Sequence, residues 1–191
     1  MCINHYNKNS IGKFLLNAIF IFISTFCFSQ NHKLKFGVKV GWNYSNVNAI
    51  DENGQPSGYL SGIIDEVYAG VILENQISDK SYLQVSPTIS YTESVTFLEL
   101  PIYYKYNIYK QFSLLIGPKI NYIPDEQNNN NYYFRKRFGI SGDIGLDYKI
   151  SNHFVVEGTF SKGFTKQYDD LILTYYNAKR NVYRLGVIYY F

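Results

Sequence analysis

The sequence has very few of the residues that form disulfides and bind metals. Its 191 residues include only 2 cysteines and 3 histidines. Both cysteines, Cys2 and Cys27, lie near the N-terminus, so a chain that has lost this segment contains none. A cysteine-based structural metal site is then excluded, and the distant His32 and His153 offer no ligand spacing. We therefore expect neither a metal nor another cofactor.

The chain also lacks an excess of charge of one sign and lacks long helical apolar segments after residue 30. The formal net charge is only +3, which does not favour a nucleic-acid-binding protein or an acidic tail. The mean hydropathy of −0.19 is too polar for a bundle of helices embedded in lipid. A β-barrel with a polar interior is compatible with the same value.

Aromatic residues are abundant, at 18% of the chain, with 20 Tyr and 14 Phe but a single Trp. Tyr and Phe favour β-strands. Tyr also suits the boundary between membrane and water, because its ring is apolar and its hydroxyl is polar. This composition favours a strand-rich protein that contacts a membrane.

The first 29 residues have the pattern of a secretory signal peptide. Lys8 and Lys13 precede an apolar stretch over 14–28, and Cys27 and Ser29 form a small-x-small cleavage pattern. We predict cleavage after Ser29, which leaves residues 30–191 as one domain. An uncleaved N-terminal membrane anchor is the alternative, since the uncharged stretch is nearly long enough to span a bilayer.

Apolar and polar residues then alternate with a period of two, as expected for strands with one apolar face. The alternation recurs in eight segments, namely 34–44, 66–74, 82–92, 97–109, 112–123, 137–150, 153–163 and 182–191. Each is about as long as a tilted strand that crosses a bilayer, and an even number of strands allows antiparallel closure.

The connections between these segments alternate in length. Short turns are predicted at 77–81, 110–111 and 151–152, whereas 45–65, 124–136 and 164–181 are long; the remaining connection, near 93–96, is short. Short periplasmic turns and longer outer loops are typical of bacterial outer-membrane barrels. The predicted fold class is therefore all-β: a closed, antiparallel, eight-stranded transmembrane β-barrel in the outer membrane of a Gram-negative cell, surrounded by outer-membrane lipid.

The faces opposite the apolar ones carry charges of both signs, and we predict that they line the lumen. An eight-stranded barrel is just wide enough to be filled by side chains, so buried charges must pair. The predicted lumen charge network consists of Lys39, Glu66, Glu99, Lys105, Lys119, Arg137, Asp143, Asp147, Glu157 and Arg184. The near balance of signs favours a plugged interior, and a narrow polar path for solutes is the alternative.

The last segment ends in an unbroken apolar face that includes Tyr189 and the terminal Phe191. A final strand that ends in Phe resembles the signal that the barrel assembly machinery reads in outer-membrane proteins. We therefore predict that Tyr189 and Phe191 form an assembly signal and that this machinery is a partner.

Several stretches resemble the PorT-like family of outer-membrane β-barrel proteins. "YAGVILENQISDKSYLQVSPTISY" and "FLELPIYYKYNIYKQFSLLIGPKINY" are similar to consecutive hairpins of that family, and "DIGLDYKISNHFVVEGTFSKGF" and "YRLGVIYYF" resemble its last strands. The resemblance implies an outer-membrane barrel. Ser86-Pro87-Thr88 stands where Gln-Pro-Glu is usual, so one lumen carboxylate of the family is missing.

The sequence offers no pattern for catalysis, and we expect a structural or interaction role rather than an enzyme. His32 precedes the first strand and His153 lies at a predicted periplasmic turn, so neither supplies a base at the outer rim. Tyr132, Tyr133 and Phe134 are unusually apolar for an outer loop and are a candidate contact with an unknown surface or periplasmic protein. The alternatives are a narrow solute pore and a soluble, lipocalin-like barrel that binds a small ligand.

Overall fold

The structure is a computed structural model, and its chain divides into two units, Met1–Lys33 and Leu34–Phe191. The structure describes residues 34–46, 53, 55, 63–91, 96–124, 137–167 and 179–191. The predicted signal peptide, residues 1–29, lies outside the described residues.

The second unit consists of strands that run antiparallel to their neighbours. The strands are β1 (Leu34–Asn46), β2 (Ile63–Gln76), β3 (Ser81–Val85), β4 (Thr88–Tyr91), β5 (Thr96–Asn107), β6 (Phe112–Tyr122), β7 (Phe138–Lys149), β8 (Phe154–Gly163) and β9 (Asn181–Tyr190). They agree with the eight predicted segments, except that the segment 82–92 is divided into β3 and β4.

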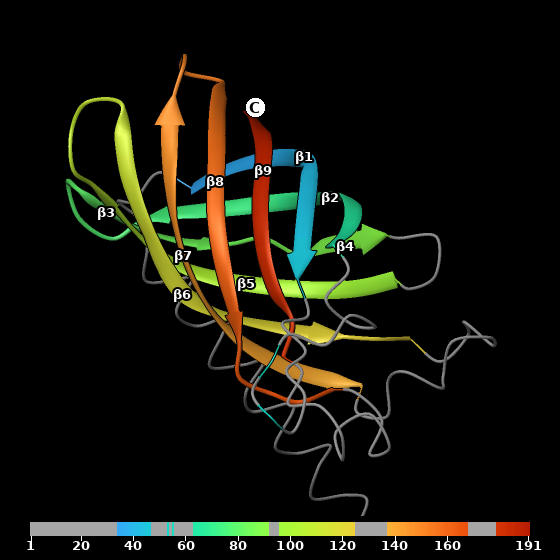
Figure 1. Cartoon of the computed structure of the whole chain (residues 1–191). Coiled ribbons are helices and arrows are strands. Elements are labelled where there is room, and N and C mark those ends of the chain that lie inside the picture. Colours follow the sequence, from blue (N-terminus) through green and yellow to red (C-terminus); the bar gives the residue numbers. More distant parts are fainter. Residues whose placement is uncertain are drawn as a thin grey trace, which may run out of the picture. The chain divides into compact units, whose positions relative to one another are not determined.

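The sheet closes on itself because the first strand pairs with the last (Figure 1). β1 pairs with β9 from Gly37, opposite Tyr190, to Asn46, opposite Asn181. Its other edge pairs with β2 along the full length of β1. Closure leaves no open strand edge, which is the condition for a sheet to cross a bilayer.

β3 and β4 act as one crossing strand that is interrupted at Ser86 and Pro87. Both lie between β2 and β5, and the register of Leu73 opposite Val85 continues without a shift to Gly70 opposite Thr88. Pro87 has no N–H to donate to the ladder, so the regular pairing stops there. The closed barrel therefore has eight crossing strands, as the alternation predicts.

The three short turns between β2 and β3, β5 and β6, and β7 and β8 lie at one end of the barrel, which we call the turn end. Each is closed by a similar backbone hydrogen bond, from Ile77 N to Ser81 O (2.8 Å), from Ile108 N to Phe112 O (3.0 Å) and from Ile150 N to Phe154 O (2.9 Å). The strand ends that the other connections join lie at the opposite end, which we call the loop end; three of these connections are long, and the one between β4 and β5 is short. In barrels of this kind the turn end faces the periplasm and the loop end faces the outside of the cell.

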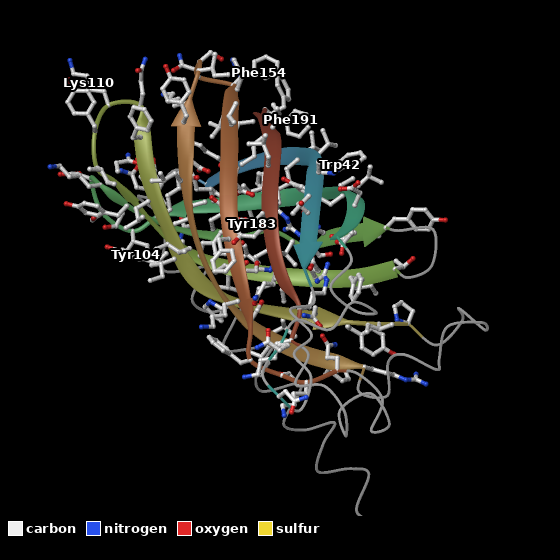
Figure 2. All side chains as sticks on the ribbon, in the orientation of Figure 1. Trp42, Tyr104, Lys110, Phe154, Tyr183 and Phe191 are labelled. Carbon is white, nitrogen blue, oxygen red and sulfur yellow. The ribbon has the colours of Figure 1, made fainter. Side chains whose placement is uncertain are left out.

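The outer surface of the barrel is apolar and aromatic. Figure 2 shows Trp42, Tyr104 and Phe154 projecting away from the wall, and Trp42 is 50% exposed. The indole Nε1 of Trp42 donates to Asp65 Oδ1 at 3.2 Å, so the one acidic side chain on the outer face of β2 has a partner. No described helix is long and apolar enough to cross a membrane.

Candidate functional site in the lumen

The lumen of the barrel is lined by charged side chains that the alternation of the strands turns inward. Nine of the ten predicted lumen charges are buried, with exposed fractions of 6% or less. These nine are Lys39, Glu66, Glu99, Lys105, Lys119, Asp143, Asp147, Glu157 and Arg184. An inward charge of this kind requires a partner, because an unpaired buried charge is costly.

A group of six charges fills the half of the lumen toward the loop end. We call it the loop-end cluster; it consists of Glu66, Glu99, Lys119, Asp143, Arg180 and Arg184. Glu99 is its centre, because Arg184, Arg180 (3.1 Å) and Lys119 (3.5 Å) all contact its carboxylate. Three cations and three carboxylates leave this cluster neutral.

A second group lies toward the turn end, and we call it the turn-end cluster: Lys35, Glu74, Lys105, Asp147 and Tyr190. Lys105 Nζ lies 2.8 Å from Glu74 and 2.7 Å from Asp147, so one ammonium serves two carboxylates. The partly exposed Lys35 reaches Glu74 at 3.4 Å, and the Tyr190 hydroxyl donates to it at 2.9 Å.

A single fully buried ion pair separates the two clusters. Lys39 Nζ lies 3.0 Å from Glu157 Oε1, and both side chains have no exposed surface. Gln84 donates to the other oxygen of Glu157 at 3.2 Å. The pair joins β1 to β8, and Gln84 connects it to β3.

The structure corrects one predicted member of the network and adds another. Arg137 lies just before β7 at the loop end, where its side chain is exposed rather than inside the lumen. Arg180, in the connection before β9, is instead inserted between Glu66 and Glu99. With Arg180 in place of Arg137, the two clusters and the central pair hold six cations and six carboxylates among the described residues, so this part of the lumen is neutral.

Three tyrosines that the sequence analysis did not single out also point inward. Tyr103 is fully buried and donates to Asp143 Oδ2 at 2.7 Å. The ring of Tyr68 lies 4.3 Å from the guanidinium carbon of Arg184. The phenol rings occupy space between the charged groups. Their hydroxyls donate hydrogen bonds to carboxylates, or their faces contact cations. Tyr103 and Tyr190 were hidden because each adjoins an outward tyrosine, and Tyr68 because it lies between the outward apolar residues Val67 and Ala69.

The lumen is not polar throughout. Ile72, Val155, Ile188 and Tyr190 form a buried group, which we call the apolar collar. Ile72 and Ile188 have no exposed surface. These side chains project inward from β2, β8 and β9, so one side of the lumen nearer the turn end is packed with apolar groups.

Other predicted features lie away from the lumen. His153 is exposed in the turn between β7 and β8, and its Nδ1 lies 2.9 Å from the backbone oxygen of Tyr190. Within the described ranges no group of three or more His, Cys, Asp and Glu could hold a metal ion. The candidate contact residues Tyr132, Tyr133 and Phe134 and the residue His32 lie outside the described residues.

The predicted assembly signal lies on the outside of the barrel at the turn end. Phe191 is 76% exposed, and its ring contacts that of Tyr189 at a centroid distance of 5.6 Å. Figure 2 shows Phe191 at the same end of the barrel as Lys110, which belongs to a short turn. The backbone N of Phe191 donates to Phe36 O at 3.0 Å, so the terminal residue remains attached to β1.

A closed antiparallel barrel with an apolar outer wall and a charged, paired interior defines the class of transmembrane outer-membrane barrels. The chain belongs to the family of outer membrane protein β-barrel domains, whose sequence model matches residues 18–191. The protein is therefore an outer-membrane protein of a Gram-negative cell. A soluble barrel of lipocalin type is wrong, because its apolar residues would line the cavity and here they cover the outside.

Solved structures with a similar fold include three bacterial barrels. Ail, the attachment invasion locus protein of Yersinia pestis, solved in complex with the heparin analogue sucrose octasulfate, has a TM-score of 0.46 at 14% identity and covers 83% of this chain and 99% of its own. Neisserial surface protein A has a TM-score of 0.47 at 11% identity, covering 82% and 97%. The N-terminal barrel domain of Pseudomonas aeruginosa OprF has a TM-score of 0.46 at 12% identity, covering 83% and 100%. A search of curated proteins found no match.

Proposed function

We propose that this barrel is a structural or interaction protein of the outer membrane, that its lumen is plugged, and that it meets a surface or periplasmic partner through its extracellular loops. The narrower PorT-like assignment is part of this proposal and rests on the resemblance of the strand sequences. The resemblance carries no partner with it, because a fold does not specify a function.

One observation carries the proposal, namely that the described lumen is filled. Six cations and six carboxylates are paired within it, and the apolar collar fills one side of it toward the turn end. A filled lumen has neither the free volume nor the excess charge that a selective pore uses. The surface that is left for recognition is the loop end.

The loop-contact role can be tested by deleting residues 126–134 and 168–178, separately and together. We expect each variant to fold, because the paired strands lie outside the deleted ranges. Folding is checked by a heat-dependent shift on a semi-native gel, and captured partners are compared by crosslinking on intact cells. Tyr132, Tyr133 and Phe134 changed together to Ser form a milder variant. Unchanged partner capture by folded deletion variants would contradict a contact through these loops.

A narrow solute pore is the second candidate, favoured only by the polar character of the lumen. Conductance of the purified barrel in planar bilayers separates the two functions. We expect no steps above the background of an empty bilayer. Reproducible conductance of the unmodified barrel would favour the pore and would remove the reason to assign function to the loops.

Export and assembly can be tested independently of the partner. We propose that residues 1–29 are removed as a signal peptide and that Tyr189 and Phe191 are read by the barrel assembly machinery. Mass spectrometry of the outer-membrane protein should find Gln30 as its first residue. Phe191→Ser should lower the amount of barrel in the outer membrane severalfold, whereas Phe164→Ser, at an exposed position of the loop end, should not.

A further inference from the structure

Arg180 occupies a socket at the loop end that is built to hold a guanidinium group. Its Nη2 lies 2.6 Å from both oxygens of Glu66, and its Nη1 lies 3.1 Å from Glu99 Oε1. The ring of Phe97 lies 3.9 Å from the guanidinium carbon. Two carboxylates within hydrogen-bond distance of the guanidinium and an aromatic ring against it are a strong combination for this cation.

The two carboxylates of the socket depend on Arg180 to different degrees. Glu99 is also contacted by Arg184 and Lys119. Within the described ranges, Arg180 is the only cation that the structure places against Glu66, whose other hydrogen-bond partners include the neutral Asn43 and Ser45. Withdrawal of Arg180 would therefore leave the loop end with one carboxylate in excess.

Arg180 differs from the other lumen cations of the described residues in its place on the backbone. It precedes β9 rather than lying in a strand, and its backbone oxygen accepts a hydrogen bond from Gly163 N at 3.1 Å. Lys39, Lys105, Lys119 and Arg184 all project from paired strands. Toward the turn end the lumen is occupied by the buried Lys39–Glu157 pair and then by the turn-end cluster. A withdrawn Arg180 would open a blind acidic chamber and not a path through the barrel.

We propose that Arg180 is a releasable plug, and that the socket of Glu66, Glu99 and Phe97 binds an external guanidinium or amine cation, such as a basic side chain of a partner, when Arg180 is withdrawn. The structure shows the ligand chemistry directly, because a guanidinium already fills the site. The proposal goes beyond the loop-contact function, since it concerns the lumen and holds whether or not residues 126–134 bind anything.

Chemical rescue tests the socket. Arg180→Ala should melt at a lower temperature than the unmodified barrel, and guanidinium at low millimolar concentration should restore part of the loss. Urea, a neutral molecule of the same shape, should not. Lys179→Ala is the matched control and should show neither the loss nor the rescue. If Arg180→Ala does not give a heat-shifted barrel, Arg180→Gln is used, which removes the charge but keeps hydrogen-bond donors. Equal effects of urea and guanidinium would overturn the socket.

Cysteine labelling tests the plug. Val182 is 1% exposed and points into the lumen two residues after Arg180, so Val182→Cys is placed in a chain whose Cys2 and Cys27 are Ser. With Arg180 present, thiol reagents added from outside should not react. With Arg180→Ala, a trimethylammonium reagent should react about tenfold or more faster than a sulfonate reagent, because an acidic chamber concentrates cations. Equal rates for the two reagents, continued protection, or through-conductance of the Arg180→Ala barrel would each overturn the proposal.

Discussion

The two ends of the lumen satisfy their charges in different ways. In the loop-end cluster, Glu99 is shared by three cations, so the loss of one leaves two. In the turn-end cluster, Lys105 alone joins two carboxylates, and the adjacent collar is apolar. The difference indicates that the loop-end cluster has redundant ion pairs. In the turn-end cluster, the pairing of two carboxylates depends on a single lysine.

The largest effect is expected for Lys105→Met, which removes the shared cation of the turn-end cluster. Asp147 then loses its ion pair at 2.7 Å, and Glu74 keeps the partly exposed Lys35 and the Tyr190 hydroxyl. Breaking a buried pair from one side typically costs about 3–5 kcal/mol, and we expect the upper part of this range. Urea unfolding of the barrel in detergent measures it. Lys149→Met, at an exposed position, is the control and should stay within about 0.5 kcal/mol.

Breaking the central Lys39–Glu157 pair should also destabilise the barrel, but a second substitution should restore much of the stability. Lys39→Met leaves Glu157 buried with a single amide donor from Gln84, at a cost of about 3–4 kcal/mol. Adding Glu157→Leu removes the orphaned charge, and the double variant should recover most of the loss. If the double variant loses as much stability as the two single variants together, Lys39 and Glu157 do not act as a pair between the two clusters.

The apolar collar should make the turn end sensitive to packing. Ile188→Ala removes a fully buried side chain of the collar, and we expect a loss of about 3 kcal/mol. Val182→Ala, which is also buried but lies in the polar loop end, should cost about 1 kcal/mol because fewer methylene groups are removed. The same urea unfolding experiment compares the two variants. Similar losses of stability would mean that the collar is no more sensitive to packing than the loop end.

The smallest effect among the charge substitutions is expected for Lys119→Met in the loop-end cluster. Glu99 keeps Arg180 and Arg184, and Asp143 keeps the Tyr103 hydroxyl at 2.7 Å. We expect a loss of about 1–2 kcal/mol, corresponding to unsatisfied hydrogen-bonding capacity rather than to an unpaired charge. A loss as large as that of Lys105→Met would contradict the redundancy of the loop end.

The strands could be predicted because each side chain in a barrel faces either lipid or lumen, which imposes a period of two on the sequence. The division at Pro87 could not be placed by the same signal, since Pro87 falls on the outward face and keeps the period. The inward residues Ile72 and Ile188 were equally hidden. Each lies between outward apolar residues, so the local pattern is apolar on both faces.

The difference between Arg137 and Arg180 has another physical cause. Arg137 continues the alternation of the predicted segment 137–150, but the strand begins one residue later, and at the rim a charged side chain can reach solvent. Arg180 lies in a connection with no periodic pattern. Its insertion follows from the positions of Glu66 and Glu99 on distant strands, and only the tertiary structure brings those together.

The equality of cations and carboxylates in the lumen also constrains how such a sequence can diverge. A lipid-facing Val can become Leu alone, but a buried Lys or Glu can change only if its partner changes in the same lineage or if a neighbour replaces it. Lys39 should therefore covary with Glu157 among relatives, and Lys105 with both Glu74 and Asp147. Lys119, whose partners have other contacts, should vary more independently. We therefore expect the lumen ion pairs to be conserved or replaced as pairs, and not one residue at a time.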